Sequence, residues 1–461
     1  MGTGLGILLL VILFSLIGAG LGIITGLIPG LHVNNLSIIL LSLSGVIMAG
    51  LTSLFGDTLG VVFISLLLAA VVVSISISHT FHDFIPSTFL GAPDPDTALS
   101  VLPAHEMLLA GKGYEAVKLS AIGSMGAIMV AFLLILPFRL VIGEPVMGYS
   151  YLKEYMIYIL VGIFAILIIT ETKEVRYRKS EPKRKSRALG IVLALFVFFT
   201  AGIFGYTVLS MDYFKPFFWP APWILPDSMM PPAVLFPMLS GIFGLSTLFE
   251  SLSAEESAPP QVITEPDVPV KSTAGSIFSG TFAGSIVGFL PGMTSGIATI
   301  MAMIFRKDTE KKQVIVTLSA INTANSLFVL VALFLILRPR SGAAIVINQL
   351  IPVAQWEALL LPESLLYLLV AVLVASCTAF ITTSAIGKLA AKHFHRISYK
   401  KLVKGIIIFI IAMVFVFTGW IGLVILGVGT VVGMLPIRLG VRRSHAMGCL
   451  LLPVILLIMN V

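Results

Sequence analysis

The sequence predicts an all-α polytopic membrane protein built from two structural repeats, and three observations support this class. First, hydrophobic residues make up 58% of the 461 residues, charged residues make up 11%, and the mean hydropathy is +1.07. Such a chain has too few polar side chains to cover a water-soluble globule. Second, apolar runs such as residues 4–25, 189–208 and 405–426 are long enough to cross about 30 Å of hydrocarbon, so we expect about 10 to 12 membrane segments. Third, a pattern of glycine and proline residues occurs twice.

The basic residues lie in short clusters between the apolar runs. Residues 173–187 contain eight Lys or Arg residues, and the positive-inside rule places them in the cytoplasm, together with residues 306–312 and 388–404. The net charge of +7 therefore reflects membrane topology, and we expect no binding of nucleic acid. No Lys or Arg precedes the first apolar run, so we expect this helix to be retained rather than cleaved. These features predict a multi-pass protein of the cytoplasmic (plasma) membrane.

The repeated pattern is G-x-x-x-G-x-x-x-G-x-x-P-G, which begins at Gly18 and again 262 residues later at Gly280. Glycines at every fourth position let a second helix approach closely, whereas Pro-Gly breaks the helix. A broken helix in a bilayer must turn its free backbone groups toward protein or water. Paired breaks in two halves of a membrane protein indicate a substrate site, although a purely structural kink remains an alternative.

The two copies are expected to be inverted relative to each other. If residues 274–305 form a re-entrant hairpin that turns at Pro291 and Gly292, both of its ends lie in the cytoplasm. Counting crossings back from residues 173–187 places the first hairpin on the outer side. The predicted organisation is a first repeat half with peripheral helices (residues 1–250), a polar linker (251–272) and a second repeat half (273–461).

Residues 76–106 form a polar, proline-containing segment between two apolar runs. Ionisable groups at membrane depth are functional candidates. Metal binding is not favoured because no H-E-x-x-H or similar spacing occurs, whereas proton coupling through His or Asp is more plausible. Ordinary solvated charges in a loop are the alternative for the acidic residues. The ionisable residues are His79, His82, Asp83, Asp94, Asp96, His105 and Glu106, of which Asp83, Asp94 and Asp96 are the ion-coupling candidates.

Amide and hydroxyl residues supply the remaining candidates. Asn322 and Asn325 repeat the three-residue spacing of His79 and His82, so we expect them to be their counterparts in the second half. Residues that follow each Pro-Gly lie at the start of an expected half-helix, where free amides favour a carboxylate or a phosphate. Helix capping is the alternative interpretation. The predicted substrate-binding residues are Pro29, Gly30, His32, Asn34, Asn35, His79, His82, Pro291, Gly292, Thr294, Ser295, Asn322 and Asn325.

The order of these elements resembles the large membrane subunit of tripartite tricarboxylate transporters, the TctA family. The resemblance rests on Gly26-Leu-Ile-Pro-Gly30, on Gly288-Phe-Leu-Pro-Gly292, on residues 91–106 followed by Gly111-Lys-Gly-Tyr-Glu-Ala116, and on Thr323-Ala-Asn-Ser326. It implies secondary transport of carboxylates, with an extracytoplasmic binding protein and a small membrane subunit as partners.

The leading hypothesis is an ion-coupled secondary transporter that moves a small anionic solute, a carboxylate, by alternating access. The runner-up is a translocase for a polyprenyl phosphate or similar anionic lipid. A third class is a membrane enzyme that uses His79, His82, Asp83 and His105. We expect no enzyme activity, catalytic residue, cofactor or bound metal, and no P-loop occurs. The expected partners are the solute or anionic lipid, membrane lipids, H⁺ or Na⁺, the two subunits named above and a second copy of the chain.

Overall fold

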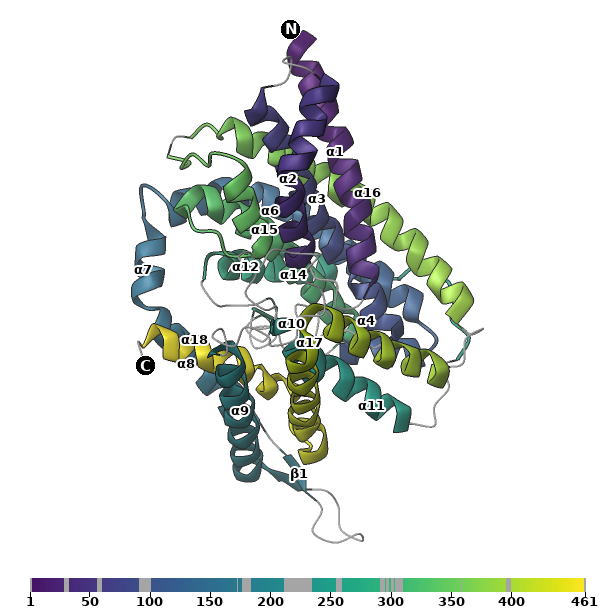
Figure 1. Ribbon diagram of the computed structural model, residues 1–461. Helices are drawn as coiled ribbons and strands as arrows, with labels where there is room; N and C mark the ends of the chain where they lie inside the picture. The colour runs from purple at the N-terminus through teal and green to yellow at the C-terminus, as the bar shows by residue number, and fades with distance from the viewer. Residues whose placement is uncertain are drawn as a thin grey trace.

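The computed structural model is helical apart from one short β-hairpin in the residues that it describes (Figure 1). These are residues 2–28, 33–55, 60–90, 101–171, 173–175, 184–210, 234–253, 259–290, 295, 298–299, 302, 310–357, 359–394 and 399–459. The first part of the chain forms α1 (Gly2–Leu27), α2 (Val33–Phe55), α3 (Val61–His82), α4 (Phe84–Leu90), α5 (Val101–Leu109), α6 (Gly113–Ile142), α7 (Gly148–Glu154), α8 (Met156–Ile169), β1 (Lys173–Val175), β2 (Arg184–Ser186), α9 (Arg187–Leu209), α10 (Leu235–Leu239), the π-helix η4 (Ser240–Leu245) and α11 (Ser246–Ser253). The remainder forms α12 (Val270–Phe289), α14 (Lys311–Ile336), α15 (Gly342–Leu350), α16 (Glu363–Phe394), α17 (Tyr399–Leu439), the 3₁₀ helix η5 (Arg443–Met447) and α18 (Gly448–Ile458).

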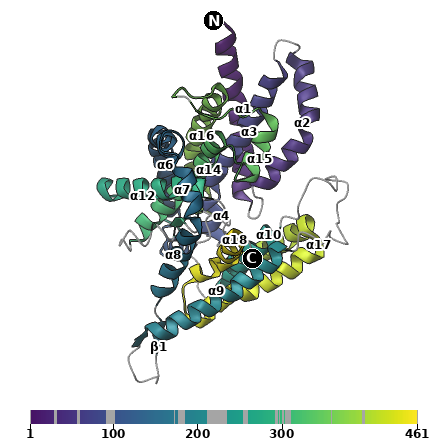
Figure 2. The ribbon, with the colours of Figure 1, turned by 90° about the vertical axis from the view of Figure 1, so that its left-hand side faces the viewer.

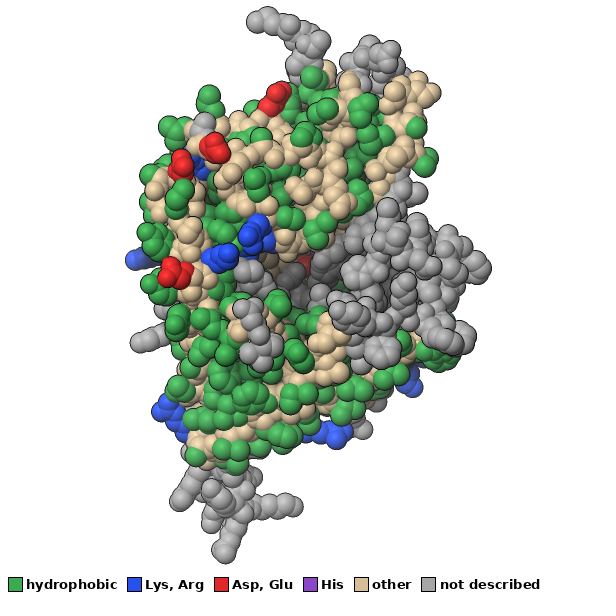
Figure 3. All heavy atoms as spheres, turned by 60° about the vertical axis from the view of Figure 1, so that its left-hand side comes forward, with side chains coloured by type: hydrophobic (Ala, Val, Ile, Leu, Met, Phe, Trp, Pro, Cys, Tyr) green, Lys and Arg blue, Asp and Glu red, His purple; other side chains and the backbone are tan. Residues whose placement is uncertain are grey.

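Seven of the described helices are long and apolar enough to cross a membrane, or eight if the bent pair α7 and α8 forms one span. The predicted 10 to 12 segments refer to the whole chain, whereas this number covers the described residues alone. Two further helices are not counted as spans: α12 is rich in Ser, Thr and Gly, and α15 has only nine residues. Many large apolar side chains are exposed on the described helices, and apolar side chains are spread over the face drawn in Figure 3, as contact with lipid requires.

The glycine-rich helices α1 and α12 each pack closely along a partner helix, α3 and α14 respectively. A methyl group added at Gly22 would lie 2.7 Å from the carbonyl oxygen of Ile75, and one added at Gly284 would lie 2.5 Å from that of Ile321. Contacts advance in the same direction along both helices of each pair, because Gly18 faces Val71 just as Gly22 faces Ile75. The helices within each pair are therefore parallel.

The core helices α3 and α14 run antiparallel to each other. Thr80 contacts Thr323, whereas Ile77, one turn earlier on α3, lines the same cavity as Ser326, one turn later on α14. Helices of one predicted half also pack on the core helix of the other half. Gly123 of α6 packs on the backbone of Val316 in α14. Likewise α16 packs on α3.

A second group of helices, α8, α9, α17 and α18 (Figure 2), packs around an apolar cluster that also includes Val287 of α12 and Ile321 of α14. Its helices also approach closely at glycines, such as Gly205 against the backbone of Cys449. The helix α17 bends at Gly419, whose φ of 61° and ψ of −154° favour glycine. Since α17 and α18 pack against α9 and η4, parts of the predicted halves 1–250 and 273–461 share one core. Residues 259–269 of the predicted linker are irregular, and the amide of Val262 donates a hydrogen bond to the carbonyl of Gly111.

Candidate functional site

The candidate site is a polar seam in the middle of the α3–α14 contact, where the two glycine-rich pairs meet. Its side chains come from the last turn of α3, from Asp83 between α3 and α4, and from the middle of α14. Asp83 and Asn322 are each 3% exposed, and His82 is 0% exposed. Buried polar groups of this kind must be satisfied by hydrogen bonds, so their partners define the site.

Gly26 sets the position of the two histidines at the end of α3. A methyl group added at Gly26 would lie 2.6 Å from Cβ of His82 and 3.0 Å from the carbonyl oxygen of His79. The close approach also brings Thr25 of α1 to His79, with 3.1 Å between Oγ1 and Nδ1. The glycine pattern that the sequence predicts for helix packing thus positions site residues directly.

His82 joins the first glycine-rich pair to α16. Its Nδ1 donates to the carbonyl oxygen of Ser78 at 2.7 Å, and its Nε2 lies 3.0 Å from Oγ1 of Thr382. The hydroxyl of Thr382 is also within 2.8 Å of the carbonyl of Thr378. Because one hydroxyl proton can point either way, Thr382 can donate to a neutral His82 or accept from a protonated one.

Two contacts link α3 directly to α14. The amide Nδ2 of Asn322 donates to Oδ2 of Asp83 at 3.0 Å. One turn away along the seam, the hydroxyls of Thr80 and Thr323 lie 3.2 Å apart. The sequence indicates both Asp83 and Asn322 as candidates, but it does not indicate that they are in contact.

Asn325 reaches the segment that follows the second Pro-Gly. Its Nδ2 donates to Oγ of Ser295 at 3.2 Å. Ser295 is 1% exposed, so this predicted residue lies inside the protein near the seam. The contact brings together two predicted site residues that are 30 positions apart.

The other predicted residues are outside what the structure describes. The backbone of Asn34 and Asn35 lies in the first turn of α2, but their side chains are not among the described groups. The remaining positions are not described at all, namely Pro29, Gly30, His32, Asp94, Asp96, Pro291, Gly292 and Thr294. Glu106, at the end of the polar segment, pairs with Lys311 at 2.6 Å on the surface, which fits an ordinary solvated charge.

The expected pairing of His79 and His82 with Asn322 and Asn325 differs by one helical turn from the register of the glycine contacts. The glycine contacts pair Ile75 with Ile321, so a residue of α3 corresponds to the residue 246 positions later in α14. The counterpart of His79 is then Asn325, and the counterpart of Asn322 is Ser76 rather than His79. Equal spacing places two side chains on the same face of a helix but does not fix their height along it. It therefore does not determine which residues of α3 and α14 correspond.

The sequence patterns did not indicate the hydroxyl side chains of the seam. Thr25, Thr80, Thr323 and Thr382 all contact a site residue or one another. Serine and threonine recur among the apolar residues of both α3 and α14, and this recurrence is a signal in the sequence. Among the described residues, no group of three or more His, Cys, Asp or Glu side chains is placed to hold a metal ion.

Comparison with known proteins bears on these features. The family model of the tripartite tricarboxylate transporter TctA family matches residues 12–448. The chain belongs to the TctA family. It is therefore a multi-pass protein of the plasma membrane from a family of transporters rather than of enzymes. A protein of Methanocaldococcus jannaschii described as uncharacterized is 26% identical over 451 residues, which cover 96% of this chain and 98% of that protein. No solved structure matches the chain.

Proposed function

We propose that this TctA family member is an ion-coupled secondary transporter that moves a small carboxylate by alternating access. The observation that carries the proposal is the Asp83–Asn322 hydrogen bond, which joins the core helices of the two glycine-rich pairs inside the protein. Secondary transporters bind their solutes where two structural repeats meet, in part through discontinuous helices. The seam occupies such a position.

The arrangement of the helices supports an inverted repeat. The pairs α1–α3 and α12–α14 make equivalent glycine contacts, and α3 and α14 are antiparallel. A two-fold axis across the α3–α14 contact would exchange the pairs, as in transporters with repeats of inverted topology. Alternating access then follows if one pair moves against the other, because the exchanged arrangement opens the opposite side.

Carboxylate binding would use the uncharged donors of the seam. Asn322, Asn325, Thr80 and Thr323 offer amide and hydroxyl protons there. We expect the backbone near both Pro-Gly breaks to contribute free amides, with His32, Asn34, Asn35 and Thr294 beside them.

Asp83 supplies a physical reason for coupling. A negative solute beside an ionised Asp83 is repelled strongly in a poorly polarisable interior. A proton or a sodium ion at Asp83 removes that repulsion, so cation and solute bind together more tightly than either binds alone. His82 can share this role, because Thr382 accommodates both of its charge states.

The partners are proposed on the basis of the family. An extracytoplasmic binding protein would deliver the solute, and a small membrane subunit would complete the complex. A second copy of the chain is a further candidate partner. Reconstitution of this chain alone tests whether these partners are required.

The test is uptake of radiolabelled succinate, citrate and butyrate into proteoliposomes with an imposed proton or sodium gradient. We expect Asp83→Asn to lose gradient-driven accumulation but to retain exchange of solute across the membrane. Asp267→Asn is the matched control, because Asp267 is exposed in the linker. Accumulation by Asp83→Asn at the level of the control would exclude Asp83 as the coupling site. Transfer of a polyprenyl phosphate without any carboxylate uptake would favour the lipid translocase.

A further inference from the structure

Two bundles of three helices meet at the α3–α14 contact. The first bundle consists of α1, α3 and α16, and the second bundle consists of α6, α12 and α14. In the second bundle the hydroxyl of Ser319 on α14 donates to that of Ser120 on α6 at 2.8 Å. In the first bundle the hydroxyl of Ser74 on α3 donates to the carbonyl of Ala371 on α16 at 3.5 Å. In the register of the glycine contacts Ser74 corresponds to Ala320, the neighbour of Ser319, so α16 lies on α3 at the same height as α6 lies on α14.

The long helices α6 and α16 also contact each other, across the boundary between the two bundles. A methyl group added at Gly387 of α16 would lie 2.6 Å from Cγ1 of Val117 in α6. At the next residue of α6, Nζ of Lys118 lies 3.1 Å from Oγ of Ser384 and 4.9 Å from the centre of the Phe380 ring. The α6–α16 contact therefore joins the two bundles at a place outside the seam.

The α6–α16 contact lies at the end of the bundles that we assign to the cytoplasm. Glu115, three residues before Lys118, pairs with Lys312 at 2.7 Å, and Lys312 belongs to the basic cluster 306–312. Gly387 immediately precedes the basic cluster 388–404. The positive-inside rule places both clusters in the cytoplasm, so two separate segments assign the contact to the same side.

At their opposite ends the same two helices pack within their own bundles. The ring centre of Phe138, near the end of α6, lies 5.8 Å from that of Phe289 in α12 and 4.9 Å from that of Phe328 in α14. Tyr367, near the start of α16, packs edge-on against Phe63 of α3, with 6.5 Å between the ring centres. In an inverted repeat, exchange of the two bundles would move the α6–α16 contact to these outer ends.

We propose that the α6–α16 contact is the cytoplasmic gate of the transporter, and that this structure has the gate closed. The inference rests on the proposed function, because it identifies the contact that must break during alternating access. The gate opens when the first bundle rotates against the second about the α3–α14 contact, and the outer ends of α6 and α16 then approach each other.

The residues of the gate are suited to repeated separation. Gly387 has no side chain, so α16 can approach Val117 closely when the gate is closed. The partners of Lys118 are a hydroxyl, an aromatic ring and the exposed carboxylate of Glu265 at 3.9 Å. Each of these contacts is weak and water can replace it, whereas separation of a buried ion pair would leave charges without compensation.

The first experiment locks the gate with a disulfide in the double variant Val117→Cys, Gly387→Cys. A Cβ atom at position 387 would lie 3.3 Å from Cβ of residue 117, close to the roughly 3.5–4.5 Å of native disulfides. The exposed Cys377 is replaced by alanine in every variant. We expect oxidation to slow the exchange of labelled succinate and citrate in proteoliposomes by about tenfold or more, and dithiothreitol to restore it.

The matched control for this disulfide is the double variant Ser120→Cys, Ser319→Cys. Its disulfide joins α6 to α14 inside the second bundle, where the two hydroxyls are 2.8 Å apart. Oxidation of the control should leave exchange unchanged, because the two helices move together.

A second measurement does not depend on the solute. Gly387→Leu inserts a side chain into the gate, so a water-soluble maleimide should label Ser384→Cys about fivefold faster in the detergent-purified chain. Gly387→Ala should give a smaller increase and replaces Gly387→Leu if that variant does not fold. Gly405→Leu is the control, because nothing lies within 4 Å of a methyl group added at Gly405.

The outcomes separate this inference from the proposed function. Exchange that continues after complete oxidation of Val117→Cys, Gly387→Cys would overturn the gate and leave carboxylate transport standing. Loss of exchange in both disulfide variants would also overturn it, since α6 would then move against α14. Labelling of Ser384→Cys that neither Gly387 variant accelerates would overturn it as well. A wild-type chain that exchanges neither carboxylate would overturn the proposed function, and the labelling rates would then decide the gate alone.

Discussion

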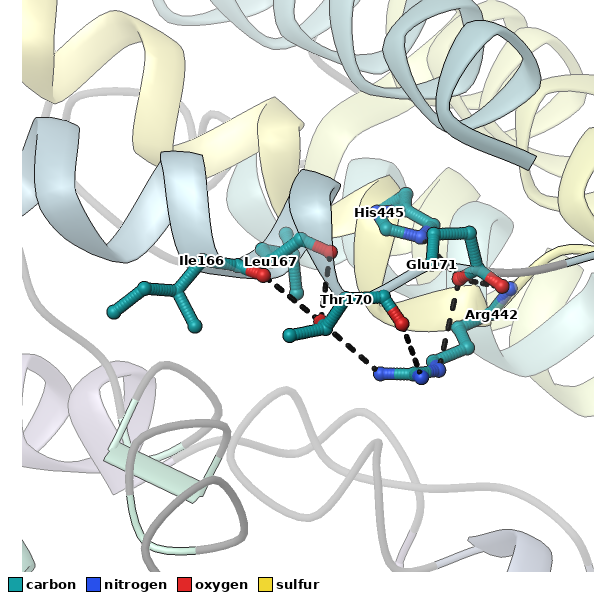
Figure 4. A network of polar contacts seen from close by, with 6 residues as sticks. All are labelled: Ile166, Leu167, Thr170, Glu171, Arg442 and His445. Atoms are coloured by element: carbon teal, nitrogen blue, oxygen red, sulfur yellow. Dashed lines mark hydrogen bonds and ion pairs between the residues drawn. The ribbon is translucent and has the colours of Figure 1, made fainter. Parts of the chain in front are cut away.

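Two buried carboxylates, Glu171 and Asp83, are held in contrasting ways. Glu171 is 2% exposed and follows α8, and its Oε2 lies 2.6 Å from Nε2 of His445 and 3.6 Å from Nε of Arg442 (Figure 4). Arg442 also donates to the backbone carbonyl of Thr170 at 2.8 Å. Asp83 is 3% exposed and accepts a hydrogen bond from the uncharged amide of Asn322.

The contrast distinguishes a contact that stabilises the fold from a contact that a bound ion or solute can replace. A carboxylate beside an arginine and a histidine stays in place, because breaking a buried pair leaves a charge without compensation. A hydrogen bond from a neutral amide is weaker and can be replaced by a bound ion or solute. We expect Glu171 to stabilise the α8–α9–α17–α18 group and Asp83 to serve transport.

The strongest test of this contrast is Glu171→Ala. Loss of the carboxylate leaves the buried Nε2 of His445 without its partner, so unfolding should become easier by about 3 kcal/mol. The measurement is the thermal unfolding midpoint in detergent. Transport per folded molecule should be unchanged. A large fall in transport with an unchanged midpoint would reverse the roles assigned to the two clusters.

Gly22→Ala probes the close packing of α1 on α3. The added methyl group would lie 2.6 Å from Cβ of Ser78, and such overpacking costs about 1–3 kcal/mol. Gly20→Ala on the same helix is the control, since nothing lies within 4 Å of its added methyl group. Equal unfolding midpoints for the two variants would contradict the packing described for this pair.

Asn322→Ala removes the donor to Asp83 at the seam. We expect carboxylate uptake to fall about tenfold, equivalent to about 1.4 kcal/mol, with a smaller effect on the unfolding midpoint. Asn348→Ala provides the control, because Asn348 is exposed on α15. Unchanged uptake by Asn322→Ala would separate the Asp83–Asn322 contact from transport.

The smallest effect concerns pH at the Glu171 cluster. Burial lowers the pKa of His445 below its ordinary 6.5, although the hydrogen bond to Glu171 opposes this shift. The folded protein thus favours the neutral ring, so its contribution to stability is present above pH 6.5 and decreases as the pH falls below that value. We expect the unfolding midpoint to decrease by a few degrees between pH 7.5 and 5.5, with a smaller decrease in His445→Gln. Identical pH profiles would exclude His445 as the titrating group.

Part of the candidate site could be predicted from the sequence. Ionisable and amide residues are conspicuous in apolar runs, and this sufficed to select His79, His82, Asp83, Asn322 and Asn325. The registers of α1 on α3 and of α12 on α14 could not be predicted, because they depend on which carbonyl each glycine meets. The threonine partners of the seam residues could not be selected from the sequence, because threonine and serine are common in membrane helices as ordinary packing residues.

The sequence by itself determined that lipid surrounds much of the chain, that the chain is helical and that a glycine-rich pattern occurs twice. These features depend on composition and on spacing along one chain. Only the tertiary structure decided which residues meet. It joined Asp83 to Asn322 across 239 positions and His445 to Glu171 across 274. Such contacts depend on the packing of whole helices against one another, which no local pattern specifies.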